Sequence, residues 1–344
     1  MHDRYRLGPL FLSGSILLAG ACLALGSEPG SFDRSLPVAG PVYLDVKSDP
    51  GGVVITAGAA GTVRVHAVIK PLFGRLDLDI AEANIRALEK NPPIEQVGGR
   101  IRLGYVKDPS LLRAVSIRFE VETPRATEVH ATTTSGGIQI DGITGPVVTA
   151  TTSGRTEISN VAGEIRVSVQ SGSVIVRNAG SSAFVRSQSG GLQLAGVQGA
   201  VDAETTSGGT EISDVAGSLR TATQSGNIRI ENAKAAVVAR NSSGSITALQ
   251  AGGSVDAETR SGAIRISQLN PAPIRALAGS GSIQVQLASG GGYQLDALSH
   301  SGKISAPTAV ASLVSKDGHS LRAPMGPGGP LVDLDTRSSR IEIR

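Results

Sequence analysis

The acidic side chains best placed to act as an acid and a base form two identical pairs. The pairs are Asp202-Ala-Glu204 and Asp256-Ala-Glu258. Arg220 and Arg240 lie between them in the sequence and could hold an anionic group beside either pair. Two carboxylates that flank one bond are the arrangement that glycoside hydrolases commonly use. A polysaccharide-active β-helix enzyme is therefore one hypothesis for this chain.

Histidine and cysteine, which often bind metals or act in catalysis, are few and scattered. The histidines are His2, His66, His130, His300 and His319, and the only cysteine is Cys22. None of them lies at a metal-ligand spacing from another. The recurrent Ser-Gly pairs lack the lysine of a phosphate-binding loop. We therefore predict no metal and no cofactor.

The Ser-Gly pairs recur at a strict interval, and this repeat decides how the acidic residues are interpreted. Successive pairs are 18 residues apart and begin at Ser135, Ser153, Ser171, Ser189, Ser207, Ser225, Ser243 and Ser261. The interval then loosens at Ser280 and Ser301. A block of three units is also copied, because residues 151–163 return almost unchanged as residues 205–217. Such a period indicates a repeat architecture.

Apolar and polar residues alternate within each repeat. Counted from the repeat serine, positions 3 and 5 are mostly apolar, as in Ile138 and Ile140, and so are positions 12 and 14, as in Val201 and Ala203. Alternation predicts strands, and the glycines predict turns between them. One unit cannot bury its apolar face alone, whereas stacked units can. We predict an all-β fold: a single-chain parallel β-solenoid with 18-residue coils, right-handed by the usual rule for parallel crossovers.

In such a stack the two acidic pairs lie three coils, or about 14 Å, apart, too far for one paired acid and base. Positions 13 and 15 face outward, and opposite charges fall there on adjacent coils. The predicted partners are Arg186 with Glu204, Asp202 with Arg220, Arg240 with Glu258 and, at position 4, Glu211 with Arg229. Opposite charges on neighbouring strands stabilise a sheet modestly. We therefore predict a non-catalytic protein, with these residues in a structural charge ladder.

The N-terminus predicts export. Arg4 and Arg6 precede the uncharged stretch Leu7–Gly26, so residues 1–26 fit a signal peptide or a membrane or lipid anchor. Two cleavage patterns stay open: a lipoprotein site in which Cys22 is lipidated, or cleavage near residues 24–26 with Cys22 as an ordinary apolar residue. We expect a cell-envelope protein that is periplasmic, membrane-anchored or at the cell surface.

The flanks of the repeat divide the remaining chain. Residues 27–41 are predicted to be a linker, 42–130 a β-rich N-terminal cap, 131–317 the repeat solenoid, and 318–344 a C-terminal loop and closing strand. One short helix is expected over residues 80–90, with Asp79 as its cap. Caps are needed because an open solenoid end exposes unpaired strand edges.

The Ser-Gly-x-Ile-x-Ile units, the strand at residues 117–124 and the export signal resemble bacterial putative-adhesin families. These are β-strand-repeat domains of unknown function, similar to the head domains of auto-transporter adhesins. The resemblance covers residues 42–344, implies a β-solenoid head domain, and brings no catalytic motif with it.

The composition and the repeat together limit the partners. The net charge of +3 combines 32 basic with 29 acidic residues, which is no nucleic-acid footprint. We expect the regular polar face to bind an unknown glycan or an envelope or surface protein, with membrane contact only through the N-terminal segment. A periplasmic scaffold or sensory domain is the alternative, and the polysaccharide-active enzyme is the third hypothesis.

Overall fold

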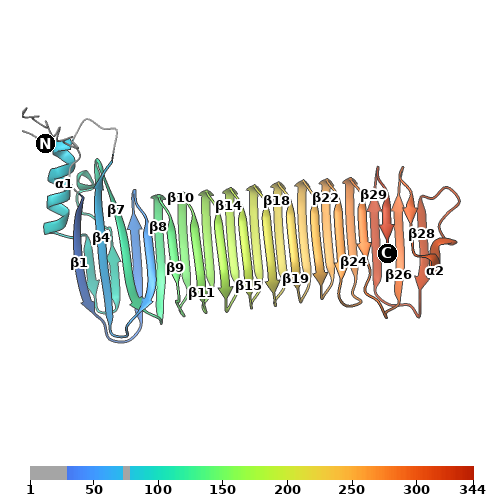
Figure 1. Cartoon of the computed structure of the whole chain (residues 1–344), viewed down its shortest axis with the longest axis horizontal. Helices are drawn as coiled ribbons and strands as arrows, with labels where there is room; N and C mark the ends of the chain where they lie inside the picture. Colours follow the sequence, from blue (N-terminus) through green and yellow to red (C-terminus); the bar gives the residue numbers. More distant parts are fainter. Residues whose placement is uncertain (1–28, 73–77) are drawn as a thin grey trace, which may run out of the picture.

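A computed structural model describes residues 29–72 and 78–344, which form a rod of two facing sheets with 15 strands each (Figure 1). Successive strands of the chain alternate between the sheets along most of the rod. The predicted parallel solenoid is confirmed, and its hand stays a prediction. The predicted export segment, with Cys22, lies outside the described residues. Within them, no helix is long and apolar enough to cross a membrane.

The repeats form the middle of the rod, and each contributes one strand to each sheet. The first sheet holds β9 (Ile138–Asp141), β11 (Thr156–Val161), β13 (Val174–Ala179), β15 (Leu192–Val197), β17 (Thr210–Val215), β19 (Ile228–Ala233), β21 (Ile246–Ala251), β23 (Ile264–Gln268) and β25 (Ile283–Gln286). The second holds β8 (Thr127–Ser135), β10 (Val147–Ser153), β12 (Ile165–Ser171), β14 (Ala183–Ser189), β16 (Val201–Ser207), β18 (Leu219–Ser225), β20 (Val237–Ser243), β22 (Val255–Ser261) and β24 (Ile274–Ser280). We call these sheet A and sheet B.

The register follows the repeat, because each residue pairs with its copy in the next coil. Ser135 faces Ser153 in sheet B, and Ile140 faces Ile158 in sheet A, both in parallel ladders. The inward positions predicted from the alternation are buried, as for Ile140 and Ile158. Each apolar column therefore packs against its own copies along the rod, which buries surface that a single coil would expose.

The glycine of each Ser-Gly pair is required by the stacking of the coils. Gly154 has a φ of +150°, and a Cβ there would lie 1.9 Å from the carbonyl oxygen of Gly136 in the preceding coil. The same close approach recurs at the equivalent glycines. A side chain at this corner would separate neighbouring coils, so the turn residue also sets the coil spacing.

A second corner, which the sequence pattern did not reveal, carries a ladder of amides. Asn160 and Asn178 both adopt the left-handed conformation, with φ values of 54° and 55°. Asn178 donates from Nδ2 to Oδ1 of Asn160 at 3.0 Å, and Asn160 donates to Oδ1 of Asp141 at 2.7 Å. Asparagine tolerates this conformation better than most residues, and the stacked amides tie adjacent coils together.

The N-terminal end is more complex than a cap followed by a first coil. Its elements are β1 (Gly30–Pro37), β2 (Val42–Ser48), β3 (Val53–Gly58), β4 (Thr62–Pro71), α1 (Leu78–Lys90), β5 (Ile94–Val97), β6 (Arg100–Leu103), the 3-10 turn Pro109–Leu112 and β7 (Val115–Pro124). Sheet A runs β1-β4-β7-β3-β9, so β3 separates β7 from the first repeat strand of that sheet. The predicted strand at 117–124 is therefore present, but β3, not β7, pairs with the first repeat strand of sheet A.

Two predictions at this end need correction. The segment predicted as a linker contains β1, which pairs antiparallel with β4 and buries Phe32; partner strands distant in sequence, not its own weak pattern, order it. The predicted helix is present as α1, but it begins at Leu78, so Asp79 lies in its first turn. Ile85 and Leu88 of α1 are buried against the sheet end, and the helix covers that end in Figure 1.

The C-terminal end also departs from the predicted loop and single strand. Its elements are β26 (Tyr293–Ser299), β27 (Ile304–Ser305), the single-turn α2 (Thr308–Ala311), β28 (Ser320–Met325), β29 (Leu331–Thr336) and β30 (Ile341–Ile343). The chain doubles back, so that β29 lies between β24 and β26, and β30 lies between β25 and β27. The last residues thus form an inner coil, and β26, β28 and α2 close the rod beyond it (Figure 1).

Candidate functional site

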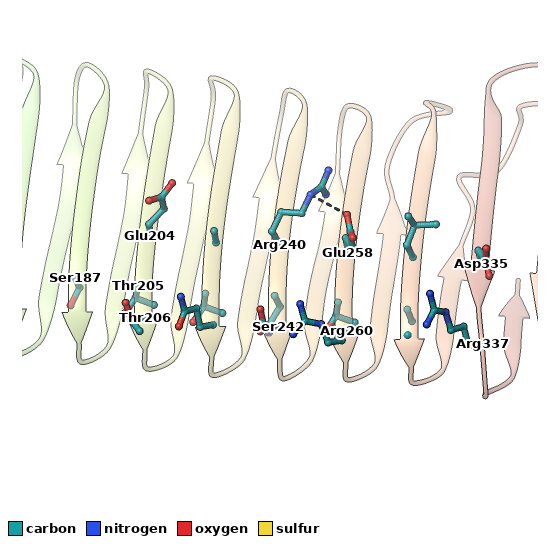
Figure 2. A pocket seen from close by; sticks show the side chains of 18 of the residues that line it. Ser187, Glu204, Thr205, Thr206, Arg240, Ser242, Glu258, Arg260, Asp335 and Arg337 are labelled. Atoms are coloured by element: carbon teal, nitrogen blue, oxygen red, sulfur yellow. Dashed lines mark ion pairs between the residues drawn. The ribbon is translucent and has the colours of Figure 1, made fainter.

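A long groove of about 860 Å³ lies on the outer face of sheet B (Figure 2). It crosses seven neighbouring strands, from β14 to β29. Its lining is Arg186, Ser187, Glu204, Thr205, Thr206, Ala222, Thr223, Gln224, Arg240, Asn241, Ser242, Glu258, Thr259, Arg260, Leu277, Ala278, Gly279, Asp335 and Arg337. The groove therefore runs along the rod and perpendicular to the strands.

The groove has two walls, each formed by one position of the repeat. Position 15 of each coil places Arg186, Glu204, Ala222, Arg240 and Glu258 side by side, because residues 18 apart are paired in register. Position 17 forms a parallel row nearer the turn. Strands are about 4.8 Å apart, so each wall offers one side chain at every such step. The small Ala222 leaves a gap in the first wall between Glu204 and Arg240.

Between the walls lies position 16, whose side chains are buried and bond mainly to the backbone. Thr259 donates to the carbonyl oxygen of Gly244 at 3.1 Å, and Asn241 donates to that of Gly226 at 2.8 Å. Among the buried side-chain polar groups of the lining, only the hydroxyl of Ser187 has no hydrogen-bond partner within the described residues. The side chains free to contact a ligand are therefore mostly those of the walls.

Two copies of one ionic cluster stand beside the groove. In the first, Arg186 donates from Nη1 and Nη2 to the two carboxylate oxygens of Asp202, at 3.1 and 3.0 Å, and its Nε lies 3.2 Å from Glu204. In the second, Arg240 holds Asp256 in the same two-pronged way, and its Nε lies 3.5 Å from Glu258 (Figure 2).

These contacts shift the pKa values of the two arginines and of Asp256 in the directions that favour their charged forms. The pKa of Arg186 is raised, first by its hydrogen bond to Asp202, against an opposing effect of burial. At Asp256, burial raises the pKa, but the hydrogen bond and charge of Arg240 and the charge of Arg275 outweigh burial, and the pKa is lowered. A carboxyl group shifted in this direction stays deprotonated at neutral pH. Asp256 is therefore poorly suited to act as a general acid.

The predicted charge ladder is correct in part. Arg186 with Glu204 and Arg240 with Glu258 form ion pairs across adjacent coils, as expected. Asp202 faces Arg220 in the register, yet no ion pair joins these two described residues, because the fork of Arg186 already occupies the carboxylate.

At position 4 of sheet A, too, the predicted facing pair does not form an ion pair. Glu211 faces Arg229 in the register, but Arg229 pairs with Glu231 on its own strand. Glu211 instead accepts a hydrogen bond from Gln193 at 3.3 Å. A long arginine side chain can choose among several carboxylates near its strand, so the register alone does not settle the pairing.

The two acidic pairs lie apart. Strands β18 and β20 separate the pair on β16 from the pair on β22, so the pairs do not form one site.

The four described histidines also lie at separate places: His66 contacts Asp33, His130 contacts Glu128, His300 lies near Asp335, and His319 contacts the carbonyl oxygen of Gly302. No group of three or more potential metal ligands occurs within residues 29–72 and 78–344. The groups that the structure does bring together, along the groove, are arginine–carboxylate ion pairs and hydroxyl side chains.

Two groove residues were missed by the sequence pattern. Arg260 occupies position 17 of a regular coil, but a lone charged residue in a repeat gives no signal of a site. Arg337 follows β29, and it reaches the groove only because β29 is inserted next to β24. No local feature of residues 331–337 indicates that insertion.

The chain is similar to one protein family and to solved structures of other proteins. The family model described as Toastrack DUF4097 matches residues 121–271 and 185–344. Among solved structures, a "putative cell adhesion protein" from Clostridium sporogenes ATCC 15579 is similar, with 10% identity, 92% of this chain and 99% of that chain covered, and a TM-score of 0.22. A "putative adhesin" from Bacteroides fragilis NCTC 9343 has 13% identity, 91% and 97% coverage, and a TM-score of 0.26. No curated protein matches the chain.

Proposed function

Because this chain belongs to the Toastrack DUF4097 family, we propose that it is an exported, adhesin-like protein of the cell envelope. In this proposal the solenoid binds an extended partner along the outer face of sheet B and catalyses no reaction. The groove that crosses seven strands is the observation that carries the proposal. Its shape suits a long, thin ligand better than a compact small molecule.

The repeated walls favour many weak contacts. Each coil presents a similar set of hydroxyl, amide or charged groups at a constant step, so a chain-like ligand can make equivalent contacts along the rod. Contacts of this kind are individually weak and add together when they are linked. A rigid solenoid also keeps its side chains in place before binding, which lowers the entropic cost of association.

The electrostatics argue for binding rather than hydrolysis. Asp202, Glu204, Asp256 and Glu258 are each committed to an arginine. A hydrolase of this type needs one carboxyl group with a raised pKa opposite a carboxylate. The lowered pKa of Asp256 points in the other direction. The same residues that first suggested an enzyme therefore support a fixed binding surface.

The proposal is tested by blocking the groove at Ala222, where the first wall has a gap. Ala222→Trp places a large ring between Glu204 and Arg240, whereas Ala195→Trp places the same ring on the outer face of sheet A as a matched control. The purified solenoid and both variants are tested against immobilised cell-wall polysaccharides, capsular polysaccharides and surface proteins. We expect Ala222→Trp to weaken binding by about tenfold or more, equivalent to about 1.4 kcal/mol. Equal loss in both variants, or no loss, would argue against the groove.

A further inference from the structure

The arginines that line the groove fall into two classes. Arg186 and Arg240 are each held by two carboxylates. Arg260 and Arg337 make no side-chain hydrogen bond or ion pair with any residue within 29–72 and 78–344. Among the acidic lining residues, Glu258 pairs with Arg240, and Asp335 lies 3.6 Å from His300. One end of the groove thus carries two guanidinium groups that form no ion pair within the described residues.

The guanidinium groups of Arg260 and Arg337 belong to the same wall of the groove, and the residue between them has no side chain. Arg260 is on β22 and Arg337 follows β29, and Gly279 of β24 occupies the place between them. A Cβ at position 279 would lie 2.5 Å from the carbonyl oxygen of Arg260, so the backbone there is too close for a side chain. Figure 2 shows Arg260 and Arg337 near the same end of their strands. Two strand steps separate them by about 10 Å.

We propose that this end of the groove binds the carboxylates of an acidic polysaccharide, with Arg260 and Arg337 each contacting one uronate. The inference rests on the proposed function and names its ligand class. A guanidinium group binds a carboxylate through two parallel N–H···O bonds, which gives both strength and orientation. The separation of about 10 Å between the arginines suits carboxylates on sugars that are not adjacent in an extended chain.

The rest of the groove favours a polysaccharide over other anionic polymers. Beyond Arg260 the same row continues with the half-buried Ser242 and the exposed Gln224 and Thr206, which can donate to and accept from sugar hydroxyls. No aromatic side chain is among the lining residues, so nucleic-acid bases would find no stacking platform. Ala222, Leu277 and Ala278 are the only apolar side chains of the lining, which offers little to the alternate side chains of a bound peptide strand.

The test measures binding of defined polyuronates to the purified solenoid by titration calorimetry. The probes are oligomers of polygalacturonate, alginate and hyaluronan, with carboxyl-reduced polygalacturonate as the neutral counterpart. The variants are Arg260→Gln and Arg337→Gln. Arg220→Gln is the matched control, because Arg220 is another arginine of sheet B that forms no ion pair with a described residue but lies outside the groove lining. Thermal unfolding of each variant checks that the fold is retained.

We expect at least one polyuronate to bind, and its affinity to fall as salt rises. Each groove variant is expected to weaken binding about tenfold, the double variant to abolish it, and Arg220→Gln to change it less than twofold. Failure of all three polyuronates to bind, equal binding of the reduced polymer, or equal loss in Arg220→Gln would overturn the inference. If a neutral polymer or a protein from the panel still binds and Ala222→Trp blocks it, the proposed function stands without this ligand. Binding of polyglutamate or single-stranded DNA in place of polyuronates would also overturn it.

Discussion

Arg240 on β20 donates two hydrogen bonds to Asp256 on β22, from Nη1 at 3.0 Å and from Nη2 at 2.5 Å. The two residues are not opposite one another in the register, where Arg240 faces Glu258. The guanidinium therefore reaches diagonally to the adjacent coil and also lies near Glu258. The identical arrangement at Arg186 and Asp202 shows that the copied block reproduces a three-residue cluster together with its strands.

The lowered pKa of Asp256 predicts a pH-dependent contribution to stability. Because the folded-state pKa lies below the unfolded value, this contribution is present above the usual aspartate pKa of about 3.9 and is lost as the pH falls through the folded-state pKa. Asp256→Asn should therefore lower the unfolding temperature at pH 7, and the difference from the wild type should shrink in strong acid. Unfolding temperatures followed by circular dichroism from pH 7 to pH 2 measure this. Asp333→Asn, at an outward site with no ion pair in the described chain, is the control for the loss of a surface carboxylate.

The buried column at position 5 should not accept a charge. Ile212 on β17 is 2% exposed, and Ile212→Asp would place a carboxylate without a partner in the core. We expect cooperative unfolding of the solenoid, with a loss of about 4 kcal/mol or more. Arg220→Ala, on the outer face, should cost less than about 1 kcal/mol. Denaturant unfolding of both variants tests the assignment of inner and outer faces, and equally mild effects would contradict it.

Adjacent glycines in one turn should respond differently to the same change. Gly208 has a φ of +136°, and a Cβ there would lie 2.2 Å from the carbonyl oxygen of Gly190. The nearest atom to a Cβ at Gly209 is 4.0 Å away. Gly208→Ala is therefore expected to destabilise the fold by about 2 kcal/mol or more, since it combines backbone strain with a collision. Gly209→Ala should change stability by less than about 1 kcal/mol. Comparable unfolding midpoints for the two variants would refute the stacking argument.

Export is expected to be detectable on living cells. A protease site inserted between Gly326 and Pro330 lies in the turn that joins β28 to β29. Cleavage on intact cells would place the solenoid on the surface, and protection until lysis would restrict it to the periplasm. A Cys22→Ser variant distinguishes the two cleavage patterns, because only a lipidated Cys22 would lose a metabolically incorporated fatty acid on substitution. Retention in the cytoplasm would contradict the export prediction.

Most of the solenoid could be predicted from the sequence because its long-range contacts repeat a short-range pattern. In the regular coils, the partner of Ile140 is Ile158, which the 18-residue period already identifies. The inward and outward faces follow from the two-residue alternation of a strand. Burial of the apolar positions and exposure of the charged ones required no further information.

The ends and the side-chain pairings were decided only in three dimensions. Terminal strands have no copy 18 residues away, so β3, β29 and β30 pair where competing strand edges and apolar faces are best covered, and the local sequence does not encode that choice. Arg337 reaches the groove through this insertion. Asp202 similarly binds Arg186 rather than the facing Arg220, because flexible side chains select among several nearby charges. The sequence thus determined the coil and its faces, and the tertiary structure determined which of the described charges are paired.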